Sequence, residues 1–326
     1  MKYVLSALAV SIALPASADT LGPYTDLLVF GDSLSDPGNV STATGGLVPF
    51  FPIYPDGQFT NGDTWATQLG ANLESGLNFA YGGATAVLTE EPDAPFDIPD
   101  FVDQRAIYGA SDVVLGDNPL TAIWFGGNDL RVLLEPEGAA LDPVALIGNV
   151  INEIVIGINE LATTGLNEFL VFGLPDLGRI PSVVNDLEAS AGATFLSTTF
   201  NTNLALTLDA FFGNDLTPTV QFFDTQSFFT DLLADADTLG ITNLTDACVI
   251  ADDDDTPENE FFFCGADQDT YAFFDGLHPT QKIHTALAGA VTDFVTPVPL
   301  PGGLSLALGG LVLLGGLAKR RKVGDA

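Results

Sequence analysis

Basic side chains are scarce in this chain, which has nine Lys and Arg against 43 Asp and Glu and a formal net charge of −34. Between the terminal segments the cations are only Arg105, Arg131, Arg179 and Lys282. A body this acidic repels phosphate backbones and anionic membrane surfaces, which argues against nucleic-acid binding. Such acidity keeps a protein soluble in salt, but it does not identify a fold or a reaction.

Cysteine is also rare, and the chain has only two. Cys248 and Cys264 are too few for a zinc site of their own, and in an oxidising compartment they favour a disulfide over two unpaired buried thiols. The acidic run from Asp252 to Asp255 lies between them. Counted as a calcium loop it puts Pro257 where glycine is needed and Phe263 where glutamate is needed, so we predict no metal site.

The first eighteen residues are typical of a secretory signal. Lys2 is followed by an apolar stretch from Tyr3 to Leu14 and by Ala16-Ser17-Ala18, a small-residue cleavage pattern. We therefore expect export and removal of residues 1–18.

The last thirty residues, 297–326, form a separate tail. Pro297-Val298-Pro299-Leu300-Pro301 precedes an apolar segment from Gly302 to Ala318 and the basic cluster 319–322. As a helix this segment is just long enough to cross a bilayer, with its basic end in the cytoplasm; a buried soluble helix is the alternative. The tail resembles a PEP-CTERM sorting signal, which implies processing by a sorting protease and, before it, membrane anchoring.

Between these ends, apolar runs alternate with helical patterns. Asp142 and Pro143 begin the clearest helix, with apolar residues at helical spacing as far as Leu161. Other helices are expected over 64–73, 183–212 and after Pro279. Strands are expected at 27–30, 77–80, 120–125, 168–173 and 220–224. This alternation predicts one α/β domain over 19–296, with a mostly parallel five-stranded sheet covered by helices on both faces.

Gly31-Asp32-Ser33 follows the first strand, and by itself such a tripeptide is more typical of a turn or a helix N-cap. A serine nucleophile needs a base, and the chain has two histidines, His278 and His284. Asp275 precedes His278 by three residues, a spacing that in a turn brings the carboxylate to one ring nitrogen and leaves the other for Ser33. His284 falls inside the following helix and is expected to be a packing or surface residue.

Acyl transfer also needs hydrogen-bond donors for the developing oxyanion. Gly82-Gly83 follows the second expected strand and Gly126-Gly127-Asn128 the third. Because the carboxyl ends of parallel strands lie along one edge of a sheet, we expect these donors and Ser33 to converge. The residues alone leave open which glycine takes part.

Four blocks carry a family resemblance, and they are Gly31-Asp32-Ser33-Leu34-Ser35-Asp36, Asn78-Phe79-Ala80-Tyr81-Gly82-Gly83-Ala84, Gly126-Gly127-Asn128-Asp129 and Asp275-Gly276-Leu277-His278-Pro279-Thr280. In this order they resemble the blocks of the GDSL lipase/esterase family, or SGNH hydrolases. The resemblance implies a flavodoxin-like three-layer α/β/α sandwich that hydrolyses esters without a metal or cofactor. It implies Ser33 as nucleophile, His278 as base, Asp275 as its orienting group, and an oxyanion hole of Gly83, Asn128 and the Ser33 backbone N–H.

Two functional classes follow. The first is an exported serine esterase or lipase acting on carboxylic esters of lipids or acylated carbohydrates, including a polysaccharide O-acetyl esterase. The second is a surface or matrix binding protein on the same fold without catalysis, since a fold alone does not establish function. The intact set of candidate catalytic residues favours the hydrolase.

Overall fold

The computed structural model describes residues 21–50, 53–87, 97–135, 138, 140–213, 217–251 and 261–296. The expected signal peptide, the acidic run Asp252–Asp255 and the expected sorting and membrane tail lie outside the described residues.

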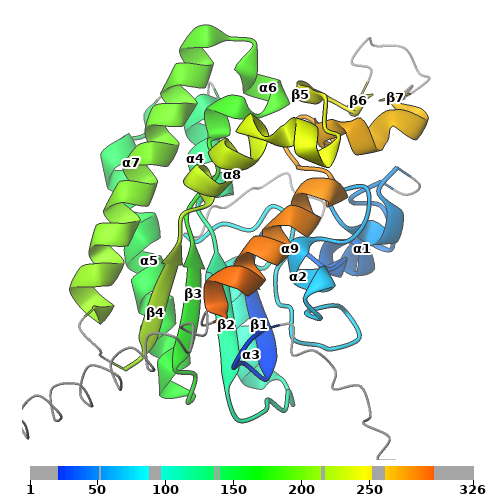
Figure 1. The fold of residues 1–326 in the computed structure, drawn as a ribbon. Coiled ribbons are helices and arrows are strands. Elements are labelled where there is room, and N and C mark those ends of the chain that lie inside the picture. The colour runs from blue at the N-terminus through cyan, green and yellow to red at the C-terminus, as the bar shows by residue number, and fades with distance from the viewer. Residues whose placement is uncertain are drawn as a thin grey trace, which may run out of the picture.

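A parallel four-stranded sheet forms the centre of the body, in the order β1-β2-β3-β4 (Figure 1). Its strands are β1 (Asp26–Gly31), β2 (Pro119–Trp124), β3 (Glu168–Phe172) and β4 (Thr219–Phe223). Leu28 and Val29 point to opposite faces of β1, and both are fully buried. Continuous apolar runs of this kind are typical of parallel strands that are covered on both faces.

The second expected strand, residues 77–80, is only an isolated bridge between Asn78 and Val29, which leaves the sheet with four strands instead of the five expected. The backbone N–H of Val29 donates to Leu77 O at 2.9 Å, and that of Phe79 donates to Val29 O at 2.8 Å. The side chain of Asn78 donates to Ser35 O and Ala71 O, and it also accepts from the N–H of Ala80. Because these bonds bind the segment to loops, it borders β1 without extending the sheet as a regular strand.

Helices cover both faces of the sheet and complete three layers (Figure 1). One face packs on α3 (Phe101–Ala110), α5 (Pro143–Thr163) and α7 (Leu187–Phe212). The other packs on α2 (Trp65–Gln68) and α9 (Gln281–Val295). The predicted three-layer α/β/α architecture is confirmed.

Two expected helices differ in extent. The helix expected over 64–73 ends at Gln68, because Gly70 takes a left-handed φ of 95° that a continuing helix does not allow. The pattern over 183–212 divides into α6 (Pro181–Val184) and α7, whose N-cap Asp186 accepts from the N–H groups of Glu188 and Ala189. A capping side chain starts a new helix there.

The helix α5 begins where expected, because the side chain of Asp142 accepts from the N–H groups of Val144 and Ala145. Of the described helices, it is the one that has the length and apolar composition to cross a membrane. Its buried residues, such as Ile151 and Ile154, belong to the core beside the sheet.

The remaining elements lie mainly around the carboxyl edge of the sheet (Figure 1). They are α1 (Asn39–Thr44), α4 (Gly127–Arg131), α8 (Thr225–Ala234), and the short strand pairs β5 (Asn243–Ala247) with β8 (Tyr271–Phe273) and β6 (Val249–Ala251) with β7 (Phe261–Phe263). The expected disulfide joins Cys248 to Cys264, with Cα atoms 4.9 Å apart. It links the segments that precede the loop carrying Asp275 and His278.

Candidate active site

Ser33 lies in a turn at the carboxyl end of β1. The N–H groups of Ser35 and Asp36 both donate to Asp32 O at 3.0 Å, and the N–H of Leu34 donates to Oδ1 of Asp32. These bonds end the strand abruptly and bring the Ser33 side chain to the sheet edge. The turn expected for an isolated Gly-Asp-Ser is thus present, and it presents the hydroxyl.

Ser33, His278 and Asp275 form a continuous hydrogen-bonded series. Oγ of Ser33 lies 2.8 Å from Nε2 of His278, and Nδ1 of the same ring lies 2.8 Å from Oδ2 of Asp275. His278 is 9% exposed, so it is shielded from solvent while still bordering the cavity. Ser33, His278 and Asp275 were predicted to act together because the chain has only two histidines and Asp275 precedes His278 by three residues. The structure brings these three residues together.

The loop after β8 holds the Asp275 carboxylate in place. Its Oδ1 accepts from the N–H groups of Leu277 at 2.8 Å and His278 at 2.6 Å, and Oδ2 also accepts from the hydroxyl of Tyr54 at 2.7 Å. Burial alone raises the pKa of Asp275, but the neighbouring His278 and these hydrogen bonds outweigh it and lower the pKa to about 2. The carboxylate is therefore ionised throughout the neutral range.

Tyr54 was not identified from the sequence. Burial, together with the adjacent Asp275 carboxylate, raises the pKa of its hydroxyl above the ordinary value, so the group remains a donor. It comes from the long Gly- and Pro-rich loop between β1 and α2, where it opens the stretch Tyr54-Pro55-Asp56-Gly57-Gln58-Phe59-Thr60-Asn61-Gly62, which also resembles the GDSL family. Nothing in its local pattern points to a contact with Asp275.

Asn128 and Gly83 occupy different positions relative to the serine. Asn128 is in α4 and borders the same cavity as Ser33 and His278. One N–H of its side-chain amide donates to Ala84 O at 2.9 Å, and the amide carries a second. Gly83 has a φ of 86° and is not among the described residues that line this cavity. Within the described chain, the backbone N–H groups of Ser33 and Gly83 have no hydrogen-bond acceptor.

Asp36 joins the serine turn to the glycine pair. Its carboxylate accepts from the N–H groups of Gly38 at 2.7 Å, Asn39 at 2.6 Å and Gly82 at 2.8 Å. Burial raises its pKa to about 6, although the hydrogen bonds act in the opposite direction. The residue was present in the first quoted block, but only the fold assigns it this connecting position.

Asp129 and Asp32 are buried carboxyl groups beside the site. Asp129 accepts from the N–H groups of Ala86 and Val87 and so holds the loop that follows Gly83. Burial raises the pKa of Asp129 to about 6 and that of Asp32 to about 7. Each is therefore protonated at a higher pH in the folded chain than in the unfolded one.

The second histidine is part of the core. His284 is 1% exposed, and its Nδ1 accepts from the N–H of Trp65 at 3.3 Å. Burial, with a smaller effect from His278, lowers its pKa to about 3, so the ring is neutral. Its packing position agrees with the expectation from helical spacing.

An apolar cavity opens beside Ser33, Asn128 and His278. Its apolar wall includes Leu134, Leu174, Leu177, Ile180, Phe229 and Leu233. Arg131 and Arg179, two of the few cations in the body, also border it. Within the described segments, no three His, Cys, Asp or Glu side chains gather as a metal ion would need.

Comparison with known proteins agrees with this geometry. The chain is similar to a phosphatidylcholine-sterol acyltransferase of Aeromonas hydrophila, at 30% identity over 71% of this chain and 68% of that protein. It is also similar to the secreted effector protein SseJ of Salmonella typhimurium, at 32% identity over 50% of this chain and 38% of that protein. An acetylesterase of Thermothelomyces thermophilus is 25% identical over 82% of this chain and 87% of its own length.

The family model described as GDSL-like Lipase/Acylhydrolase matches residues 27–291, which include most of β1, all four motif blocks and most of α9. The three-layer fold and the hydrogen bond between Ser33 and His278 agree with this family match. The chain belongs to the GDSL-like lipase/acylhydrolase family and is an ester hydrolase.

Proposed function

We propose that this protein is a serine esterase that hydrolyses carboxylic esters through an acyl-enzyme on Ser33. The observation that carries the proposal is the series of two 2.8 Å contacts from Ser33 to His278 and from His278 to Asp275. A hydroxyl bonded to a base that is itself oriented by a carboxylate is the arrangement required for an activated serine nucleophile.

In the first half-reaction, Oγ of Ser33 attacks the ester carbonyl carbon while Nε2 of His278 accepts the hydroxyl proton. The ionised Asp275 keeps the other proton on Nδ1 and stabilises the imidazolium that forms. The tetrahedral intermediate then collapses, the carbon–oxygen bond to the alcohol breaks, and His278 returns its proton to the leaving alkoxide. The product is an acyl ester of Ser33 and a free alcohol.

In the second half-reaction, water loses a proton to His278 and attacks the acyl-enzyme. The proton then returns to Ser33 as the carboxylic acid leaves. The oxyanion of each tetrahedral intermediate accepts hydrogen bonds from the backbone N–H of Ser33 and Gly83 and from the amide of Asn128. Among the described residues, the two backbone groups have no acceptor, and the Asn128 amide carries a second N–H besides the one bonded to Ala84 O; both observations support this assignment.

The apolar cavity favours esters with an apolar acyl group as the substrate class. A polysaccharide O-acetyl esterase is the second candidate, supported by the similarity to an acetylesterase. A panel of p-nitrophenyl esters from acetate to long-chain acyl, with lysophospholipids and acetylated sugars, separates the two. A kcat/KM highest for acetylated sugars would reject the lipid-like substrate.

A fluorophosphonate probe tests the nucleophile directly, because it phosphonylates an activated serine. Labelling should be found on the peptide that contains Ser33 and should be absent from the Ser33→Ala variant, which should also lose nearly all hydrolysis of p-nitrophenyl butyrate. A wild-type protein that takes no label and cleaves no ester would instead support a non-catalytic binding protein on this fold.

We further propose that the hydrolase domain, residues 19–296, acts outside the cytoplasm. The signal-like residues 1–18, the disulfide and the similarity to a secreted effector protein support export. The tail 297–326 then serves as an anchor until a sorting protease removes it. Mass spectrometry of both termini of the protein, isolated from the organism that makes it, tests export and processing. Intact termini on a protein found in the cytoplasm would reject this proposal.

A further inference from the structure

The segment that follows β3 forms one wall of the cavity. Leu174, Leu177 and Ile180 of this segment line the space beside Ser33. The Leu174 side chain also lies 4.0 Å from the Cβ position of Gly127, which is next to Asn128. A shift of this segment would therefore change the space available to a substrate.

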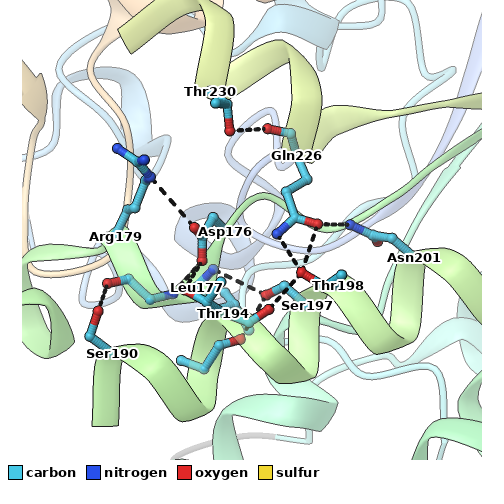
Figure 2. Close-up of polar contacts among 12 residues, drawn as sticks. Asp176, Leu177, Arg179, Ser190, Thr194, Ser197, Thr198, Asn201, Gln226 and Thr230 are labelled. Atoms are coloured by element: carbon cyan, nitrogen blue, oxygen red, sulfur yellow. Dashed lines mark hydrogen bonds and ion pairs between the residues drawn. The ribbon is translucent and has the colours of Figure 1, made fainter. Parts of the chain in front are cut away.

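Polar side chains on one face of α7 hold this wall segment, residues 174–180 (Figure 2). Ser190 Oγ donates to Gly178 O at 2.8 Å, and Thr194 Oγ1 donates to Oδ1 of Asp176 at 2.7 Å. Further along the helix, Ser197 Oγ accepts from the N–H of Leu177 at 3.1 Å. These side chains recur every three or four residues, the spacing of a single helix face.

Asn201 continues the same face and makes two hydrogen bonds to the wall segment, one of them the shortest to this segment. Its Oδ1 accepts from the N–H of Leu174 at 2.6 Å, and its Nδ2 donates to Leu174 O at 2.8 Å. The amide thus pairs with both backbone groups of one wall residue. We call Ser190, Thr194, Ser197 and Asn201 the α7 polar row.

The wall segment and α7 are in close contact. A Cβ on Gly178 would lie 2.2 Å from Ser190 O and from Thr194 Oγ1, and a Cβ on Gly173 would lie 2.9 Å from Asn201 Oδ1. The absence of side chains at these two glycines lets the backbone approach the row. The position of the wall is therefore set by short polar contacts to one rigid helix.

The polar row is not needed by the helix itself. The apolar residues of α7 pack into the core beside the sheet, and they include Ala193, Leu196, Phe200 and Leu204. Two polar members of the row are buried as well, because Ser197 is fully buried and Asn201 is 7% exposed. Burying hydroxyl and amide groups is costly unless they are hydrogen-bonded, and their partners here belong chiefly to the wall. The row therefore serves the wall segment.

We propose that the α7 polar row is a specificity device that holds Leu174 and Leu177 in place to bind an apolar acyl chain longer than acetyl. The row does not touch the reacting atoms, so its members are positioning residues. The inference rests on the proposed esterase function and adds to it the acyl class that the site selects.

The test compares p-nitrophenyl acetate with p-nitrophenyl octanoate. Thr194→Val keeps the shape of the side chain but removes its hydroxyl, and Asn201→Ala removes both bonds to Leu174. Each should raise KM for the octanoate about tenfold and leave kcat for the acetate within about twofold, because displaced apolar contacts affect chiefly the longer chain.

Two matched variants serve as controls. Thr194→Ser restores the hydroxyl and should recover the wild-type KM for octanoate. Asn203 lies on the exposed side of the same helix, so Asn203→Ala should leave KM and kcat unchanged for both esters. An equal loss on both esters, accompanied by a lower Tm, would reduce the row to a purely structural role and overturn the proposal, as would no change on either ester.

A binding measurement separates this inference from the proposed function. Octanoate, the acid product, can be titrated calorimetrically into wild type and Asn201→Ala without turnover. We expect an affinity about tenfold weaker in the variant. An unchanged Kd would reject the role of the row even if the enzyme is an esterase. A larger Kd in the variant would support that role even if Ser33 proved inactive.

Discussion

The hydroxyl of Tyr54 donates to Oδ2 of Asp275 at 2.7 Å, and this is the same oxygen that lies 2.8 Å from Nδ1 of His278. A carboxylate oxygen that accepts from two donors is fixed in position. Tyr54 is itself held in place, because its ring packs edge to face on Phe274. Tyr54 thus connects the long loop after β1 to the base of the proposed catalytic series.

Tyr54→Phe removes this hydrogen bond while keeping the ring. We expect kcat for p-nitrophenyl butyrate to fall about tenfold with KM nearly unchanged, since a hydrogen bond to a charged group contributes about 1.5 kcal/mol or more. Steady-state kinetics at pH 8 measures this. The variant Tyr271→Phe is a control in the same region, and a Tyr54→Phe enzyme with wild-type kcat would show that the contact is dispensable.

The same substitution should change acid stability. The pKa of Asp275 is lowered in the folded state, so its contribution is complete above the unfolded value of 3.8 and is lost as the pH falls toward about 2. Without the Tyr54 donor the folded pKa rises toward 3.8 and this contribution shrinks. Urea unfolding between pH 5 and pH 2.5 should show a smaller loss of stability in Tyr54→Phe than in wild type. Parallel curves would contradict the assigned coupling.

Asn128→Ala removes a proposed oxyanion donor. Loss of a comparable donor costs about 10²–10³ in kcat, and we expect that range here with KM changed by less than about threefold. The amide also holds Ala84 O at 2.9 Å, so thermal unfolding must be measured alongside the kinetics. A variant that folds normally and retains full kcat would remove Asn128 from the oxyanion hole.

Asp129 predicts a pH dependence of the opposite sign to Asp275. Burial raises the pKa of Asp129 to about 6, so the folded state binds the carboxyl proton more tightly than the unfolded state does. As the pH rises from about 4 through 6, ionisation of this buried carboxyl group therefore destabilises the folded state. In Asp129→Asn this penalty is absent. The stability of the variant relative to wild type should therefore increase between pH 4.5 and pH 7.5.

High salt makes the Asp129 measurement selective. The formal charge of −34 also destabilises the protein as carboxylates ionise, but 0.5 M NaCl screens exposed charges and leaves a buried group largely unaffected. The difference between Asp129→Asn and wild type should persist in that salt. If it disappears, surface repulsion and not burial accounts for the effect.

The disulfide should stabilise the region before the His278 loop. Cys248 and Cys264 are 16 residues apart, and closing a loop of this size contributes about 3 kcal/mol through the unfolded chain. The double variant Cys248→Ser/Cys264→Ser should lose about that amount in urea unfolding, and dithiothreitol should affect wild type alone. Equal stability of the two proteins would show that the cross-link adds nothing.

The sequence by itself determined the layered α/β class, the start of α5 at the Asp142 cap, the disulfide pair and the series of Ser33, His278 and Asp275. These follow from local signals: an apolar run ends at a turn, a cap precedes a helix, and Asp275 lies three residues before one of only two histidines. Such signals survive because they depend on neighbours along the chain.

Tertiary structure alone decided that residues 77–80 form a bridge instead of a fifth strand, that Tyr54 reaches Asp275, and that Asn201 pairs with the backbone of Leu174. In each case the partners are far apart in sequence, by 221 residues for Tyr54 and Asp275. The physical reason is that a buried polar group takes whichever partner the packing of distant elements brings to it, and no local propensity encodes that choice.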